Sequence, residues 1–201
     1  MVVTVKKVQL AVTTFQPYKA PGADSIYPAH LIKGMDRIVM HLIHIFSSCL
    51  TLGYISDPWK RVRVVFISKP LKIVYKIAKG FRPISLTSFL LQTMERLVER
   101  YLRENTLVDH PLHITQHAYE QGRSVDSALY SVVGYIEKGL KKGEVTLRIF
   151  QDIEEAFDNI LYKSIDKAIA DTKVNKTIAR WMERLLSTRR IEAQLGESTV
   201  R

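Results

Sequence analysis

The sequence predicts an α+β fold in which helices pack on small, mostly antiparallel sheets. Apolar residues recur every three or four positions over several long stretches, which is the period of a helix with one buried face. Shorter stretches alternate apolar and polar residues or are continuously apolar, as strands are. Of the 201 residues, 46% are hydrophobic, so the chain can bury a real core in one domain or in two small lobes.

The clearest predicted helices lie in the first half of the chain. Residues 28–52 place apolar side chains on one face, with Pro28 suited to the first turn and Gly53 to the C-terminal cap. Residues 88–107 repeat this pattern, and residues 1–17 form a short amphipathic lead-in. These stretches are predicted to supply the core rather than a site.

Strands are predicted in four places. Residues 59–70 alternate between apolar and basic side chains, and Pro83 further on fits an edge strand or the start of a strand. Residues 145–150 are an apolar run that predicts a buried strand ending at Asp152. Residues 191–200 predict a terminal strand pair.

The second half is predicted to be mainly helical. After a loop at residues 109–123, Ser124 caps a helix that runs to residue 140, and residues 159–170 and 175–190 form two more. The side chains that the first of these three helices is predicted to bury are Ala128, Leu129, Val132, Val133 and Ile136.

The charge balance favours a polyanionic partner. The formal net charge is +10, which attracts nucleic acid through steering and counterion release. A basic protein with no nucleic-acid role is the alternative. In the segment of residues 59–70, Lys60, Arg61, Arg63 and Lys69 would line an exposed edge that suits phosphate contact, or would form an ordinary solvated face.

Cysteine usage and the N-terminus indicate an intracellular protein, without distinguishing nucleus from cytoplasm. Cys49 is the single cysteine, so no internal disulfide can form, and its apolar helical pattern predicts a core residue. The N-terminus lacks the layout of a signal peptide. The most apolar run, residues 38–52, is interrupted by His41 and His44 and is too short to span a bilayer, so no membrane partner is expected.

Asp152 is the candidate catalytic residue. It stands at the end of a predicted buried strand and is followed by Ala156, Phe157 and Asp158. A strand would hold the carboxylate still, and Mg²⁺ demands strict geometry with oxygen ligands, so the position suits a divalent cation. A helix-capping role for Asp152 is the alternative.

Five short motifs follow one another along the chain. They are Lys-Ala-Pro-Gly-Ala-Asp at residues 19–24, Phe-Arg-Pro-Ile-Ser-Leu at 81–86, Gln-His-Ala-Tyr at 116–119, Gly-Arg-Ser at 122–124 and Arg-Ile-Phe-Gln-Asp-Ile-Glu-Glu-Ala-Phe-Asp-Asn-Ile at 148–160. In this order they resemble the reverse transcriptases of jockey-like non-LTR retrotransposons. The resemblance runs from about residue 5 to residue 201 and covers the N-terminal part of that domain only.

This resemblance implies an incomplete right-hand polymerase. Residues 1–144 would form a fingers-like region, and residues 145–201 a partial palm with the first catalytic motif, the following helices and the terminal strand pair. The implied activity is RNA-directed DNA synthesis, in which a primer 3′-hydroxyl attacks a deoxynucleotide with the help of two Mg²⁺ (or Mn²⁺) ions. The implied partners are an RNA template, a DNA primer, deoxynucleotides and a missing palm or thumb segment or further chain.

The resemblance also implies roles for residues near the reacting groups. Asp152 and the backbone carbonyl of Ile153 would hold metal. Arg82 would contact the triphosphate of the incoming nucleotide, because a guanidinium binds phosphate oxygens bidentately; a surface ion pair is the alternative. Lys69 would also bind the nucleotide, and Phe157 would crowd the sugar 2′ position and so disfavour ribonucleotides.

A second group of residues would contact template and primer. Tyr119 would stack on a base and Arg123 would hold a phosphate, or the loop that carries them is simply packed around Tyr119. The remaining members of this group are Lys60, Arg61, Arg63 and Lys72.

The sequence also departs from the family's pattern. The Asp-Asp pair that the family has later in the palm is absent, and one carboxylate anchors two ions poorly, so we expect this chain alone not to polymerise. Other unusual positions are Leu71, Gln92, Val125, Gln151 and Glu155. Three interpretations remain open: a fragment of an active enzyme, a decayed copy that still binds RNA or DNA, or a basic protein-interaction module.

Overall fold

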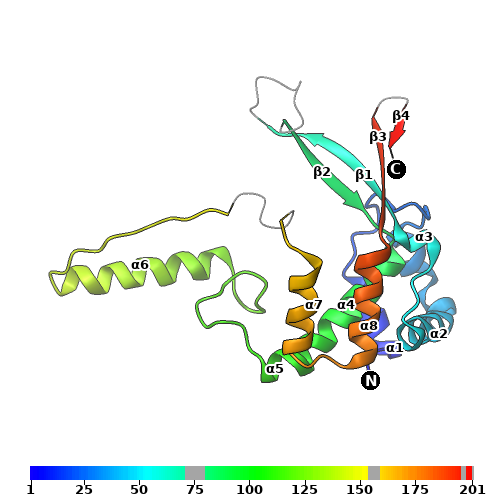
Figure 1. Cartoon of the computed structure of the whole chain (residues 1–201), viewed down its shortest axis with the longest axis horizontal. Helices are drawn as coiled ribbons and strands as arrows, with labels where there is room; N and C mark the ends of the chain where they lie inside the picture. The colour runs from blue at the N-terminus through cyan, green and yellow to red at the C-terminus, as the bar shows by residue number, and fades with distance from the viewer. Residues whose placement is uncertain (71–79, 154–158, 196–197, 201) are drawn as a thin grey trace.

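The computed structural model describes residues 1–70, 80–153, 159–195 and 198–200, and it has the mixed α+β architecture that the sequence predicts (Figure 1). The helices are α1 (Val5–Thr13), α2 (Pro28–Leu52), α3 (Asp57–Lys60), α4 (Phe89–Tyr101), α5 (Leu107–Asp109), α6 (Val125–Lys141), α7 (Tyr162–Asp171) and α8 (Lys176–Thr188), with a π-helical turn (Leu102–Thr106) between α4 and α5. The strands are β1 (Arg61–Ser68), β2 (Phe81–Leu86), β3 (Arg190–Leu195) and β4 (Ser198–Val200).

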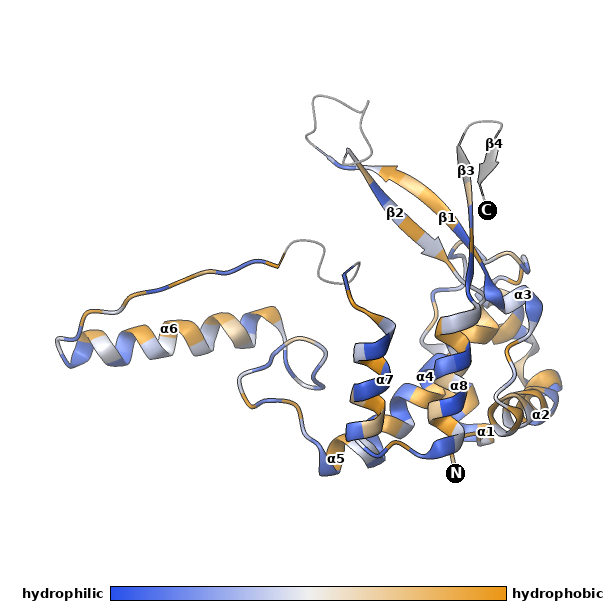
Figure 2. Cartoon of the chain, in the orientation of Figure 1, coloured by the Kyte–Doolittle hydropathy of each residue, from blue (hydrophilic) through white to orange (hydrophobic). Residues whose placement is uncertain are grey.

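The hydrophobic core lies among α1, α2, α4 and α8, which turn apolar faces toward one another (Figure 2). Phe46 of α2 and Trp181 of α8 are almost completely buried. Phe15 and Phe89 stack edge-on, with ring centroids 4.9 Å apart. Gly53 ends α2 with a φ of 61°, as the sequence predicts. In the part of the chain that the structure describes, no helix has the length and apolarity needed to cross a bilayer.

A four-stranded sheet stands beyond this helical core, in the order β2-β1-β3-β4. The β1–β2 and β3–β4 pairs are antiparallel, and β1–β3 is parallel. The prediction of a mostly antiparallel sheet is therefore confirmed. The parallel pair brings the end of the chain beside residues 61–64, so one sheet contains strands from both halves of the sequence.

A tight corner joins the loop of residues 19–24 to the junction between β2 and α4. Ser88 is fully buried and caps α4 by accepting hydrogen bonds from two backbone N–H groups of its first turn. Its hydroxyl also donates to Oδ2 of Asp24 at 2.5 Å. Gly22 packs so closely that a Cβ there would lie 2.6 Å from the backbone nitrogen of Ser88 and from the carbonyl carbon of Thr87. The first motif therefore packs directly against Thr87 and Ser88, the two residues that follow the second motif.

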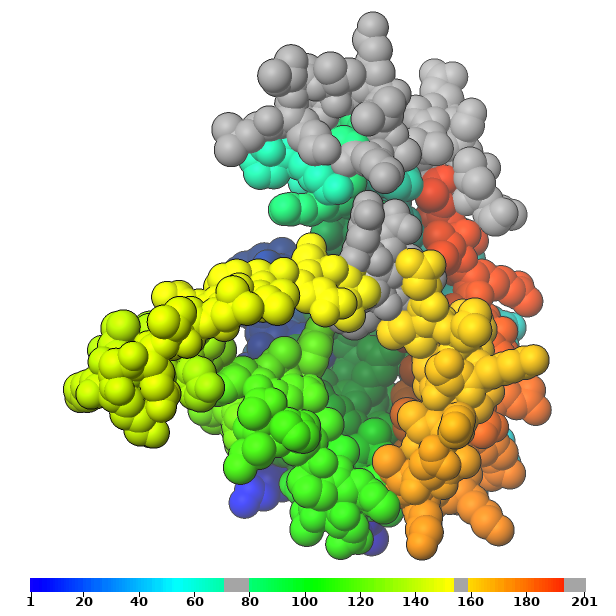
Figure 3. All heavy atoms as spheres, turned by 60° about the vertical axis from the view of Figure 1, so that its left-hand side comes forward, coloured from blue at the N-terminus to red at the C-terminus, as the bar shows by residue number. Residues whose placement is uncertain are grey.

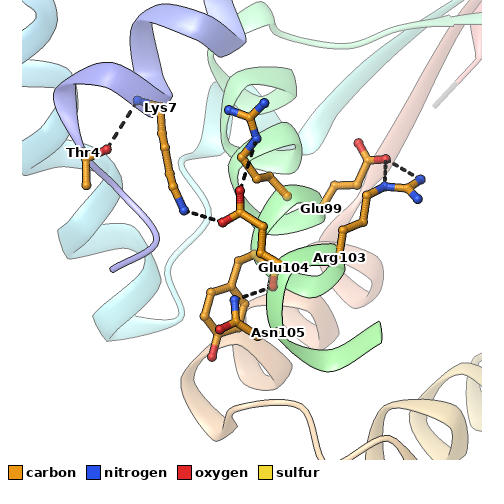
Figure 4. Close-up of polar contacts among 8 residues, drawn as sticks. Thr4, Lys7, Glu99, Arg103, Glu104 and Asn105 are labelled. Carbon is orange, nitrogen blue, oxygen red and sulfur yellow. Dashed lines mark hydrogen bonds and ion pairs between the residues drawn. The ribbon is translucent and has the colours of Figure 1, made fainter. Parts of the chain in front are cut away.

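A polar contact ties α1 to the π-helical turn that follows α4, and a second one joins that turn to α4 itself (Figure 4). Lys7 donates to Glu104 at 2.8 Å, and Arg103 donates to Glu99 at 2.9 Å. The hydrogen bond from Lys7 lowers the pKa of Glu104 below its ordinary value. Glu104 belongs to the π-helical turn, so the helix predicted for residues 88–107 continues past α4 with a changed hydrogen-bond pattern.

The helix α6 forms the expected element but does not bury the expected face. It projects sideways from the helical core, and the segment that follows it runs back alongside it (Figures 1 and 3). Of the side chains predicted to point inward, Leu129, Val132 and Val133 are exposed by 58%, 44% and 48%. The prediction was wrong here because an amphipathic pattern specifies an apolar face but not the element that covers it.

The buried strand predicted for residues 145–150 is not formed. These residues lie in an extended, exposed segment outside the sheet, and Ile149 and Phe150 are exposed by 82% and 87%. A strand needs a neighbouring backbone to accept and donate its hydrogen bonds. The described strands pair with one another, so the apolar run has no neighbour among them.

Candidate nucleic-acid interface

A basic face on the β1–β2 hairpin is the best-defined candidate site. In the β1–β2 register, Arg63 lies opposite Leu86, and Ile67 lies opposite Arg82. Directly opposed residues of neighbouring strands share one face of a sheet, and residues two apart on a strand do too. Arg61, Arg63 and Arg82 therefore lie on the same face, and all three side chains are exposed. We call these three residues the arginine face.

The other face of β1 explains why the arginines point outward. Val62 and Val64 alternate with the arginines and are buried, with 3% and 7% exposure. Burial of these two side chains fixes which way the strand faces, because a shift by one residue would bury the arginines instead. The alternation seen in the sequence is therefore confirmed for the first half of β1, whereas Phe66 further along is partly exposed.

Lys60 does not belong to the strand edge on which the sequence placed it. It is the last residue of the short helix α3, and its Nζ donates to Oδ1 of Asp57 at 2.6 Å and lies 5.9 Å from the centre of the Tyr54 ring. The hydrogen bond from Lys60, with the nearby charges of Arg190 and Arg61, lowers the pKa of Asp57. The edge prediction was wrong because the Asp-Pro pair before Trp59 begins a helical turn.

Arg190 lies beside the arginine face, although its sequence context predicts the end of a helix. It is the first residue of β3, and the parallel register sets it beside Arg61. A cavity of about 540 Å³ opens at this point, lined by Asp57, Lys60, Arg61, Arg190, Ile191 and Glu192. In the sequence, the Arg-Arg doublet at residues 189 and 190 indicates a further basic site. Only the strand pairing shows that Arg190, and not Arg189, lies beside the arginine face.

The end of the hairpin where β1 finishes and β2 begins carries two residues that are expected to bind a nucleotide. Arg82 is the second residue of β2, and Lys69 directly follows β1, where its backbone N–H donates to the Gly80 carbonyl at 2.9 Å. The hairpin thus brings both to its outer end. Lys72, like Leu71, lies outside the described residues.

The loop of residues 110–124 positions Tyr119 and Arg123 differently. Tyr119 has a φ of 61° and an exposure of 70%, so its ring is accessible for stacking. It lines a cavity of about 490 Å³ together with Lys7, Arg96 and Arg100. Arg123 instead donates a hydrogen bond to the Ile114 carbonyl and so holds the loop in shape. Arg123 thus has a structural contact within the loop, whereas the exposure of Tyr119 does not agree with a loop packed around its ring.

Asp152 and Ile153 lie on the extended segment after α6, not on the sheet that carries the arginine face. Both are exposed. Among the residues that the structure describes, no three His, Cys, Asp or Glu side chains gather as a metal site would require. Mg²⁺ takes about six oxygen ligands in near-octahedral geometry, so one carboxylate and one carbonyl do not fit a complete site. Phe157 and Glu155 lie outside the described residues.

Comparison with known proteins adds a family and several relatives. A family model described as reverse transcriptase (RNA-dependent DNA polymerase) matches residues 67–200. The chain is 27% identical over 163 residues to the RNA-directed DNA polymerase from mobile element jockey of Drosophila funebris, a match that covers 81% of this chain and 18% of the relative.

Two further relatives have similar identity. The probable RNA-directed DNA polymerase from transposon BS of Drosophila melanogaster is 25% identical over 81% of this chain and 18% of its own length. The retrovirus-related Pol polyprotein from type-1 retrotransposable element R1 of Bradysia coprophila is 26% identical over 82% of this chain and 16% of its own length. The chain thus spans less than a fifth of the length of these curated relatives.

Proposed function

The chain belongs to the reverse transcriptase family, and we propose from this premise that it forms the nucleic-acid-binding part of an RNA-directed DNA polymerase of a non-LTR retrotransposon. The resemblance inferred from the five sequence motifs is confirmed at the level of the family, and the relatives carry the names of jockey and other mobile elements. Family membership implies an RNA template, nucleotide substrates and a divalent metal in general.

In this proposal the region before residue 145 corresponds to fingers and residues 145–201 to a partial palm. The order of the motifs supports this assignment. The parallel pairing of β1 with β3 is compatible with it, because a fingers hairpin and the strand that follows the first palm helices would then meet in one sheet.

The arginine face is the observation that carries the proposal. Three guanidinium groups on one face of a two-stranded hairpin offer planar donor pairs that match phosphate oxygens bidentately. Val65 and Ile84 lie opposite each other on the same face, between the arginines. A surface of this kind contacts the sugar–phosphate backbone and does not read sequence, which suits a polymerase that must accept any template.

Arg82 is proposed to contact the triphosphate of the incoming deoxynucleotide, with Lys69 beside the same end of the hairpin. Arg61 and Arg63, nearer to the helical core along β1, are proposed to hold the nucleic-acid backbone. Tyr119 is proposed to stack on an unpaired base of the template.

A duplex-binding experiment tests this assignment. A fluorescently labelled RNA–DNA primer–template would be titrated with the wild-type chain and with Arg63→Gln, and the anisotropy recorded. The variant should bind several-fold more weakly, because it loses one phosphate contact. Arg37→Gln, on the exposed side of α2, removes the same charge away from the sheet and serves as the matched control. Equal affinity of Arg63→Gln and the control would contradict the assignment.

Catalysis by this chain alone is not part of the proposal. Asp152 and the Ile153 carbonyl would contribute oxygen ligands to a divalent metal, and further carboxylates would have to come from a missing palm segment or another chain. Primer extension on an RNA template with Mg²⁺ and deoxynucleotides, with Asp152→Asn as the comparison, tests this view. No extension is expected. Extension that disappears in Asp152→Asn would show that this chain completes a metal site.

A further inference from the structure

Two arginines stand side by side where β1 and β3 begin (Figure 1). Arg61 is the first residue of β1 and Arg190 is the first residue of β3, and the parallel register pairs them directly. Neighbouring strands lie about 4.8 Å apart, so the two side chains leave the backbone at adjacent points. Both residues are exposed, and both line the cavity of about 540 Å³ at this junction.

This pairing places two positive charges next to each other. Like charges directly opposite on neighbouring strands are destabilising. Among the residues that the structure describes, neither guanidinium forms an ion pair with an acid. An anion bound between the two arginines would remove their repulsion, and the oxygens of one phosphate group can accept hydrogen bonds from both guanidinium groups.

The two acids that line the cavity have cations of their own beside them. Asp57 accepts the hydrogen bond from Lys60 at 2.6 Å, and this bond, together with the charges of the two arginines, lowers the pKa of Asp57. Glu192 lies opposite Arg63, two residues further along the same face. Neither acid therefore takes the place between the two arginines, where a phosphate would bind.

The position along the hairpin identifies the kind of phosphate. Ile67 lies opposite Arg82, and the six residues from Arg61 to Ile67 span about 20 Å of strand. A nucleotide whose triphosphate binds at Arg82 is therefore a separate ligand. Phosphates of one strand of a duplex follow one another about every 3.4 Å along the axis, so the pair of arginines would meet a linkage several nucleotides away.

We propose that Arg61 and Arg190 together bind one phosphodiester group of the nucleic acid, several nucleotides from the incoming nucleotide. Arg190 thereby extends the arginine face from β1 onto β3. The inference rests on the proposed binding of nucleic acid to that face, and it adds a binding residue from the second half of the chain.

Removal of the second arginine tests this site. Arg190→Gln should bind a fluorescently labelled RNA–DNA primer–template several-fold more weakly than the wild type, as measured by anisotropy. Arg184→Gln removes the same charge from an exposed position of α8 and should bind as the wild type does. Because Arg190 is exposed, its substitution should leave the helices intact, which circular dichroism reports.

A scan with neutral linkages shows whether the two arginines share one phosphate. A methylphosphonate removes the charge of a single linkage, and one such linkage would be moved stepwise along each strand of the primer–template. At one position the wild type should lose affinity several-fold. Arg61→Gln/Arg190→Gln should lose nothing more at that position, because its contact with this phosphate is already absent. Arg184→Gln should keep the sensitivity of the wild type.

The possible outcomes separate this inference from the function on which it rests. If Arg63→Gln weakens binding but Arg190→Gln binds as its control does, the shared site is refuted while the arginine face stands. The shared site is also refuted if every linkage that matters to the wild type matters equally to the double variant. If neither Arg63→Gln nor Arg190→Gln differs from its control, the proposed function itself fails.

Discussion

Replacing Gly22 by alanine should disrupt the corner where the loop of residues 19–24 meets the junction between β2 and α4. The new Cβ would lie 2.6 Å from two backbone atoms, whereas ordinary van der Waals contact begins at 3.4 Å, so the loop must move by about 0.8 Å. Backbone atoms cannot turn aside as the end of a flexible side chain does. The strain therefore falls on the corner as a whole.

The expected cost follows from two terms. Overpacking a close contact typically costs about 1–3 kcal/mol. The same movement would stretch the 2.5 Å hydrogen bond from Ser88 to Asp24, and losing a hydrogen bond to a charged group costs about 1.5–3 kcal/mol. Because the two effects overlap, we expect Gly22→Ala to lower the free energy of unfolding by about 3 kcal/mol.

Urea unfolding followed by tryptophan fluorescence measures this change, since Trp59 and Trp181 are both buried in the folded chain. Gly34→Ala is the matched control. Gly34 lies inside α2, and an added Cβ would meet only the Ile38 side chain at an ordinary 3.8 Å. This control should raise stability by about 0.5–1 kcal/mol, because alanine favours helix over glycine.

The result that would refute the reasoning is a Gly22→Ala chain that unfolds within about 0.5 kcal/mol of the wild type, which is the range of ordinary surface substitutions. Such a result would mean that the loop is not packed on the Ser88 corner in solution. Loss of stability in Gly34→Ala as well would show instead that the assay reports helix changes in general.

Two further predictions concern charged pairs. Arg189 forms an ion pair with Glu95, and burial raises the pKa of Glu95 despite this partner. Arg189→Met would leave the Glu95 carboxylate without its partner, so it should lower the free energy of unfolding at pH 7 by about 1 kcal/mol. The loss should shrink once the carboxyl is protonated in acid. Arg184→Met, at an exposed position of α8 shortly before Arg189, should change the free energy of unfolding little. Glu104 has a lowered pKa because Lys7 donates to it, so its contribution to stability is present above the ordinary value of 4.5 and is lost as pH falls through the folded pKa. The unfolding midpoints of wild type and Glu104→Gln should therefore differ at pH 7 and converge in acid, and a difference that is constant with pH would contradict this assignment.

The helical core was predictable because its signals are local. Residues 28–52 have a proline at the start, a glycine at the end and an apolar stripe between them, and each of these features acts within a few residues. The predicted cap at Ser124 is of the same kind, since its hydroxyl accepts from the backbone three residues on. These elements appear where the sequence placed them.

The parts that were not predictable depend on distant partners. Nothing near Arg190 in the sequence indicates that it lies beside Arg61, because strand pairing between distant segments sets that contact. The approach of Gly22 to Ser88 is likewise a tertiary contact. The apolar run at residues 145–150 has the composition of a buried strand, but a strand forms only where another backbone pairs with it.

The candidate site was predicted in part. Alternation along β1 identified Arg61 and Arg63 as exposed, and the strand register adds Arg82 to the same face. Lys60 was misplaced because a short helical turn precedes the strand. The roles of these residues, and those of Asp152 and Tyr119, remain predictions.

The central claim is that the arginine face binds the phosphate backbone of nucleic acid, and the salt dependence of binding tests it most directly. Affinity for an RNA–DNA primer–template would be measured over a range of salt concentrations for the wild type and for Arg61→Gln/Arg63→Gln/Arg82→Gln. Each lost phosphate contact should reduce the steepness of log affinity against log salt by about 1, so the triple variant should lose about 3. An unchanged slope in the triple variant would contradict the claim, because the binding charges would then lie elsewhere on the chain.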